Sequence, residues 1–457
     1  MKRSKLAMTL AFAMCSSILF AQQKVAENMY LKKLKNGLEV LVIEDSTVPL
    51  ATIEIACRNG SFTETPEYNG LSHLYEHLFF SANKDYPTES SFLQKSNDLD
   101  ITSNATTQEE VVNYYFTLPS QNLKEGLKFM NSAIRFPLFN AAEMKKENEV
   151  VNAEFTRHES NPTFDFIEAD TRRLWGNNYS RKNVIGNHEI ILSATPAKMD
   201  SIKNKYYWPN NSVLVVAGDV KATQVFAEVE NVFGSWKAST FDPFVKWPIP
   251  EVQPLKQNDY YVFKTDKVLD PQILFSWHGP DTRNDVLGTY VADVFSYLVN
   301  QNGSKLKKAL ISSGLAQNAN VGYYTQKYTG PIRLSVSPNP QKIKECYEEI
   351  MKQIALWDDQ DYLSDAQIER AKRLLAIEQV KRREVTSDYS HLISFWWASA
   401  SIDYYTHYEE NLNKVTRKDL IDYVRKYIKD KPYVAGLMIH NGLVAGVKPE
   451  EFFKSNK

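Results

Sequence analysis

The sequence is poor in cysteine, has almost no net charge and has no long apolar run after its N-terminal segment. It contains only three cysteines in 457 residues, so a disulfide framework is excluded as the source of stability. Basic and acidic side chains nearly balance, 54 against 55, which argues against a nucleic-acid partner or an anionic membrane surface. Beyond the N-terminal segment, no apolar run approaches the length of a membrane-spanning helix. We therefore expect a mature chain that is stabilised by hydrophobic cores and does not insert stably into a membrane.

The N-terminal segment, residues 1–21, has the pattern of a secretory signal peptide. Lys2, Arg3 and Lys5 precede an apolar run that ends near Ala21, a small residue typical of a cleavage site. We predict cleavage after Ala21, loss of Cys15 with the signal, and a periplasmic or secreted mature protein. The alternative is that the same run stays attached as an N-terminal membrane anchor.

A proline-rich stretch divides the rest of the chain near its middle. Residues 239–257 carry four prolines and little periodicity, which is typical of a linker between domains. We predict an N-terminal domain over residues 22–238 and a C-terminal domain over residues 258–457. Both halves close with a helical pattern, a pair of tyrosines and an apolar strand, at residues 197–218 and 417–439. This recurrence indicates a duplication.

Local patterns in the first half predict both strands and helices. The expected strands have β-branched or alternating apolar residues, and the expected helices have long polar and apolar repeats. The strands are residues 37–43, 51–56, 100–107 and 111–118, the last two forming a hairpin, and the helices are residues 121–134 and 141–158. We predict an α+β fold of two homologous domains, each with an antiparallel or mixed sheet and helices packed on one face.

A short motif of two histidines and a glutamate is the strongest chemical signal in the chain. His73 and His77 are four residues apart, so on a helix their imidazoles share one face and can reach one metal ion. Glu76 lies beside them and can act as a general base. Two histidines do not complete a catalytic zinc site, which usually takes three protein ligands. A third ligand must therefore come from elsewhere in the chain.

A later helix offers two candidates for that third ligand. Asn140 and Glu143 have the spacing of a capping box, which sets the start of the helix. Glu147 and Glu154 are seven residues apart, nearly two turns, so they project from the same face. Either glutamate alone is most often a solvated helix residue. Together with the histidine motif, they become candidate ligands or supports of a metal site.

These motifs resemble those of the pitrilysin/insulinase family of inverted-motif zinc peptidases, which includes the mitochondrial processing peptidase. The resemblance covers essentially the whole mature chain. It is carried by the H-x-x-E-H motif, the pair of glutamates, and the segments at residues 60–64, 104–106 and 207–211. It implies the two-domain fold of that family.

The resemblance implies a role for each residue of the two motifs. His73, His77 and Glu154 would hold one Zn²⁺ per chain, which activates a water molecule. Glu76 would take the proton of that water and pass it to the leaving amine. Glu147 would hydrogen-bond a ligand or the water and fix its orientation. The alternative for Glu147 is an ordinary residue of the helix surface.

The resemblance also implies where a peptide substrate binds. Asn104, Ala105 and Thr106 match a family strand that borders the cleft. An extended peptide would pair with this strand by β-augmentation. Because backbone pairing tolerates many sequences, we expect broad peptide specificity.

The second half departs from the family pattern. Catalytic members commonly carry there an arginine and a tyrosine, seven residues apart, that bind the substrate carbonyl. Alignment on Gly314 places Leu310 and Gln317 at these positions. We therefore predict a heterodimer in which this chain bears the metal and a second family subunit supplies the arginine and tyrosine, the two enclosing a chamber. The alternatives are a non-catalytic peptide-binding or scaffold subunit and a self-sufficient homodimeric peptidase.

Overall fold

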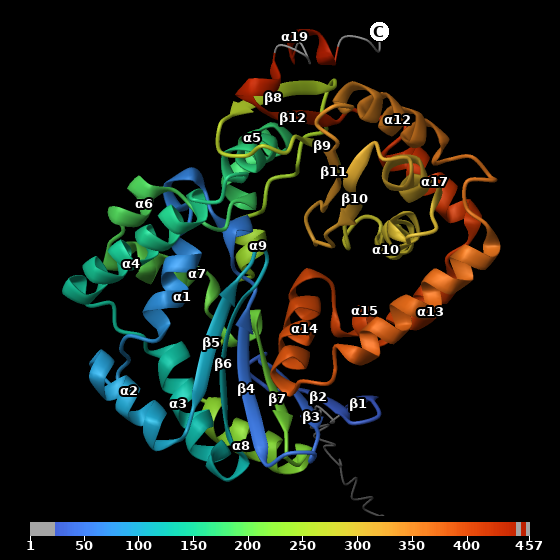
Figure 1. Cartoon of the computed structure of the whole chain (residues 1–457). Helices are drawn as coiled ribbons and strands as arrows, with labels where there is room; N and C mark the ends of the chain where they lie inside the picture. Colours follow the sequence, from blue (N-terminus) through green and yellow to red (C-terminus); the bar gives the residue numbers. More distant parts are fainter. Residues whose placement is uncertain (1–22, 445–448, 454–457) are drawn as a thin grey trace, which may run out of the picture.

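The computed structural model describes residues 23–444 and 449–453 (Figure 1). The predicted signal peptide and its cleavage point lie outside the described residues. The strands are β1 (Gln23–Ala26), β2 (Met29–Lys33), β3 (Glu39–Glu44), β4 (Leu50–Cys57), β5 (Thr102–Thr107), β6 (Val112–Pro119), β7 (Ser212–Gly218), β8 (Asp259–Thr265), β9 (Gln272–His278), β10 (Ala316–Tyr323), β11 (Pro331–Pro338) and β12 (Val434–His440).

The helices divide between the two halves of the chain. In the first half they are α1 (Leu71–Phe79), α2 (Glu89–Asp98), α3 (Leu123–Arg135), α4 (Ala141–Glu159), α5 (Phe164–Trp175), α6 (His188–Leu192), α7 (Pro196–Tyr206) and α8 (Ala222–Phe233). From the predicted linker onward they are α9 (Pro243–Lys246), α10 (Val286–Asn300), α11 (Lys305–Lys307), α12 (Ile343–Leu356), α13 (Asp365–Lys381), α14 (Thr386–Ser399), α15 (Ile402–Thr406), α16 (Tyr408–Lys414), α17 (Arg417–Tyr427) and α19 (Pro449–Phe452).

Two sheets of matching topology form the framework. The first has the strand order β1-β2-β3-β7-β4-β6-β5, and the second has β10-β11-β9-β12-β8. In the first sheet β7 lies parallel to β3 and antiparallel to β4; in the second, β12 lies parallel to β8 and antiparallel to β9. Each sheet then continues through an antiparallel pair, β4 with β6 and β9 with β11. The predicted α+β fold of two homologous units is confirmed.

The expected hairpin of the first half is also present. Strands β5 and β6 pair antiparallel, with Thr106 opposite Asn113. Asp100, expected inside the first strand, has a φ of 53°, in the left-handed region, so the strand begins only at Thr102. Strand β5 lies at the end of the sheet order, so its outer side is an edge.

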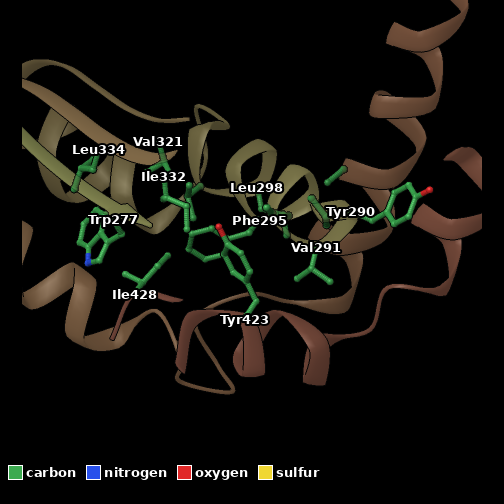
Figure 2. Close-up of a cluster of buried hydrophobic side chains, with 14 of the residues drawn as sticks. Trp277, Tyr290, Val291, Phe295, Leu298, Val321, Ile332, Leu334, Tyr423 and Ile428 are labelled. Carbon is green, nitrogen blue, oxygen red and sulfur yellow. The ribbon is translucent and has the colours of Figure 1, made fainter. Parts of the chain in front are cut away.

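Each sheet packs through buried apolar side chains against the helices of its own half. Figure 2 shows the core of the second half, in which Phe295 of α10 lies beside Tyr423 of α17, and Trp277 from the sheet and Leu298 of α10 belong to the same cluster. All four side chains are buried. In the first half, α1, α3 and α8 pack on one face of the first sheet in the same manner. Burial of these apolar faces is the main source of stability for both units.

The two halves also exchange a helix. Helix α14, from the second half, packs on β4 and β7 of the first sheet, and α5, from the first half, packs on β9 and β12 of the second (Figure 1). Trp397 of α14 therefore shares a core with Val213 and Val215, while Phe166 of α5 shares one with Met438. The sequence predicted helices on one face of each sheet; the other face is covered by the opposite half. The predicted domain boundaries stay a prediction.

The cysteines outside the predicted signal peptide and the apolar character of the helices bear on the expectations from composition. Cys57 and Cys346 are buried and form no disulfide, and burial raises the pKa of each thiol to about 12. Among the described residues, no helix combines the length and apolar character needed to cross a membrane. The two thiols thus act as small apolar core groups.

Candidate metal centre

The start of helix α1, which carries the histidine motif, is held by a buried carboxylate. Glu64 accepts hydrogen bonds from the backbone N–H groups of Gly70, at 2.8 Å, and Ser72, at 2.7 Å. Gly70 has a φ of 92°, and a Cβ there would lie 2.7 Å from the Cα of Gly186. Only glycine therefore fits at this position. Together these contacts set the direction in which α1 leaves the loop.

The pH dependence of stability should report on Glu64. Burial raises its pKa to about 7, against the opposing effect of the hydrogen bonds from Gly70 and Ser72. The folded chain therefore binds this proton more tightly than the unfolded chain, and the free energy of unfolding falls as pH rises from about 4.5 to about 7, by up to about 3 kcal/mol. We expect Glu64→Gln to flatten this slope, measured by urea unfolding across that range. Glu67→Gln, at an exposed neighbour, is the control; an unchanged slope in Glu64→Gln would contradict the assignment.

Helix α4 packs against α1 and brings the third donor to the two histidines (Figure 1). The Nε2 atom of His77 lies 3.4 Å from Oε2 of Glu154, and Nε2 of His73 lies 3.8 Å from the same oxygen. One donor atom from each of the three residues lies within 4.8 Å of the others. Among the described residues, this is the one group of its kind that could hold a metal ion. The structure thus brings the three predicted ligands together.

The donor set fits a zinc ion. Two ligands of a tetrahedral zinc, each about 2.0 to 2.2 Å from the ion, lie roughly 3.4 Å apart, close to the separations seen for Glu154. The other oxygen of Glu154 is engaged by Nη2 of Arg157 at 2.8 Å, so Oε2 is the one directed at the histidines. Nδ1 of His77 lies 2.9 Å from Oε1 of Glu147, which leaves Nε2 of that ring for a metal.

The electrostatics of the site differ between the two histidines. Burial, reinforced by the nearby His77, lowers the pKa of His73 to about 4, so this ring is neutral, as a ligand must be. Burial also lowers the pKa of His77, but the hydrogen bond with Glu147 and the neighbouring carboxylates outweigh it, and the net direction is upward. Burial raises the pKa of Glu76, partly offset by a hydrogen bond from Thr107.

The metal group lines a cavity of about 710 Å³ that also contains the predicted base and the predicted substrate strand. Thr107 donates from its hydroxyl to Oε2 of Glu76 at 2.5 Å, which fixes this carboxylate beside the donors. Asn104, Ala105 and Thr106 lie along one wall in β5, where Asn104 and Thr106 are exposed and Ala105 is buried. The geometry brings all predicted site residues to one cavity; the role of the strand in substrate binding stays a prediction.

Three residues that orient the site were not among the predicted site residues. Glu64, Thr107 and Arg157 each orient a motif residue or its helix. Glu64 lies in the segment 60–64 that carries the family resemblance, and Thr107 ends the expected strand 100–107, whereas no sequence pattern pointed to Arg157. The capping box predicted at the start of α4 is incomplete: its N-cap residue is confirmed, and the reciprocal contact from Glu143 is wrong. Asn140 accepts from the N–H groups at the helix start, but the box is not completed by Glu143, whose Oε2 is buried without a hydrogen-bond partner in the described part of the chain.

A duplicated α+β fold with a His-His-Glu donor set beside a further glutamate is typical of zinc peptidases with an inverted motif. The family model for insulinase, peptidase family M16, matches residues 39–182, and the model for the peptidase M16 inactive domain matches residues 193–375. The chain belongs to this pitrilysin/insulinase family.

Known proteins agree with this assignment. An uncharacterized zinc protease of Rickettsia felis is 28% identical over 211 residues, which are 46% of this chain and 51% of that protein. The match thus spans about half the length of that relative. A protease from Helicobacter pylori superposes with a TM-score of 0.78 at 20% identity, covering 89% of this chain and 98% of that one. The periplasmic protease PqqL from Escherichia coli superposes with a TM-score of 0.77 at 16% identity, covering 96% of this chain and 51% of that one. At these identities the superpositions establish the fold.

Proposed function

We propose that this chain is a zinc metalloendopeptidase that hydrolyses peptides or unfolded polypeptide segments. The observation that carries the proposal is the convergence of His73, His77 and Glu154 on one wall of a cavity that also holds Glu76 and an edge strand. A bound zinc ion would supply Lewis acidity, which lowers the pKa of water and polarises a peptide carbonyl.

The chain's own residues account for proton movement and orientation. Glu76, held at Oε2 by Thr107, takes a proton on Oε1 from the attacking water and delivers it to the leaving amine nitrogen. Glu147 accepts from Nδ1–H of His77 and so keeps that ring turned with Nε2 toward Glu154. An extended peptide pairs with the free edge of β5, which holds its backbone along the cavity wall.

We also propose that activity requires a second family subunit. Leu310, at the position where the family arginine is expected, is fully buried in a π-helix, Lys308–Ser312, and carries no charge. Gln317, at the tyrosine position, is exposed on β10. Loss of such donors costs about 10²- to 10³-fold in rate, which a partner that carries them would restore. The signal-like N-terminus and the periplasmic relative PqqL support a periplasmic location.

Metal analysis and peptide cleavage, with and without the partner, test this proposal. We expect one zinc ion per purified chain, loss of cleavage of an unstructured peptide after treatment with a chelator, and recovery when zinc is added back. We expect weak cleavage by the chain alone and an increase of about a hundredfold or more when the partner subunit is added. A metal-free chain that binds peptide without cleaving it contradicts the peptidase assignment, whereas full activity of the chain alone contradicts only the heterodimer.

A further inference from the structure

Glu54 is a carboxylate buried on the face of the first sheet that α14 covers. Its neighbours in β4, Ile53 and Ile55, belong to the core beneath the first half's own helices. Because side chains alternate along a strand, Glu54 points to the opposite face, where its exposure is 0%. A buried carboxylate without hydrogen bonds is strongly unfavourable. The packing of α14 on this face of the sheet therefore requires hydrogen-bond partners for Glu54.

Two of these partners come from the second half of the chain. Nδ1 of His391 and the hydroxyl of Ser394 both hydrogen-bond to the Glu54 carboxylate. They are three residues apart in α14, so they lie on one face of the helix. The third partner is Asn113 of β6, whose Nδ2 donates to Oε1 of Glu54 at 2.9 Å. Glu54 is therefore a polar contact between the first sheet and α14, beside the apolar packing of Trp397.

Asn113, one of the partners of Glu54, also contacts the edge strand β5. Oδ1 of Asn113 accepts from the backbone N–H of Thr106 at 3.0 Å and from its hydroxyl at 2.5 Å. The ring of His391 also lies on Tyr115, with centroids 4.1 Å apart, and Tyr115 lies opposite Asn104 in the pairing of β6 with β5. A continuous set of contacts thus joins α14 to Asn104 and Thr106.

Strand β5 depends on these contacts because, among the strands that the structure describes, it pairs only with β6 and forms the edge of the sheet. Its next residue, Thr107, holds Glu76 on the other side of the strand. We propose that His391 and Ser394, acting through Glu54, are positioning residues: the second half of the chain holds β5 in the register and at the distance from Glu76 that a bound peptide needs. This inference rests on the proposed function, in which β5 is the strand that binds peptide.

Two substitutions of His391 separate its hydrogen bond from its ring. His391→Phe keeps a ring over Tyr115 and removes the donor to Glu54, whereas His391→Asn keeps a donor near the position of Nδ1. For a peptide substrate, we expect His391→Phe to raise KM about tenfold with kcat within about twofold, and His391→Asn to stay within about threefold of the wild type. His407→Phe, at a half-exposed histidine elsewhere in the second half, is the matched control and should change neither constant.

Amide hydrogen exchange gives a readout that does not need catalysis. In His391→Phe, the amides of residues 102–107, above all Thr106, should exchange faster relative to the rest of the chain, while zinc content stays at the wild-type level. Tm should fall, because the buried carboxylate of Glu54 loses one of its donors. If His391→Phe does not fold, Ser394→Ala, which removes another donor to the same carboxylate, is measured instead. Unchanged KM and unchanged exchange of β5, or faster exchange spread evenly over the chain, would overturn the inference. A wild-type protein without peptidase activity would overturn the proposed function, and the exchange result would still decide the positioning role.

Discussion

Replacing Glu76 with glutamine should lower kcat/KM for peptide cleavage by about 10²- to 10⁴-fold, the contribution expected of a general base. Glutamine has nearly the same shape as glutamate and keeps an oxygen that can accept the hydrogen bond from Thr107. It cannot take a proton from water. The loss corresponds to about 3 to 5 kcal/mol of transition-state stabilisation. Zinc content should remain one ion per chain, because Glu76 is not among the three converging donors.

The matched control for this substitution is Glu89→Gln. Glu89 is an exposed residue that lines the same cavity but lies outside the metal group, so its replacement should change kcat/KM by less than about twofold. Steady-state cleavage of a fluorogenic peptide by both variants, in the presence of the partner subunit, checks the prediction. If Glu76→Gln cleaves at the wild-type rate with its zinc bound, another group is the base and the assignment of Glu76 is wrong.

The second large effect is expected for the glutamates of α4. Glu154→Ala removes one of three donors, so we expect zinc affinity to fall by more than about a hundredfold and cleavage to be lost with it. Glu147→Gln leaves all three donors in place and weakens only the support of His77, so its affinity should fall by about 10- to 100-fold. Glu149→Ala, at an exposed position of the same helix, should bind zinc as the wild type does.

Competition for zinc with a chromophoric chelator measures these affinities directly. The expected order of affinity is wild type equal to Glu149→Ala, then Glu147→Gln, then Glu154→Ala. Wild-type affinity in Glu154→Ala would mean that a different side chain completes the site, and His158, which lines the same cavity, would be the next residue to test. Equal losses in Glu147→Gln and Glu154→Ala would contradict the distinction between support and ligand.

Much of the metal centre could be predicted because its geometry is local to two helices. The spacing of His73 and His77 places both rings on one face of any helix, and the spacing of Glu147 and Glu154 does the same. The residue-level patterns could not distinguish which glutamate is the ligand, and the family resemblance supplied that choice. In the structure, Oε2 of Glu154 faces both Nε2 atoms while Glu147 contacts Nδ1 of His77. The packing of α1 on α4 places the two glutamates at these positions; the assignment of Glu154 as the ligand stays a prediction.

Strand alternation, helix periodicity and helix spacing are properties of neighbouring residues, so the sequence alone predicted most of the strands and helices around the site in the first half. The inverted motif, the hairpin that carries the cavity wall, and the duplication of the sheet follow from such patterns. The way in which the halves cover each other, with α14 on the first sheet and α5 on the second, emerged from the fold and from no local pattern. Glu54 and His391 are 337 positions apart, and no local pattern links a carboxylate in one half to a helix face in the other. Their contact arises because each sheet has two apolar faces to bury, and the chain closes the second face of each with a helix from the opposite half.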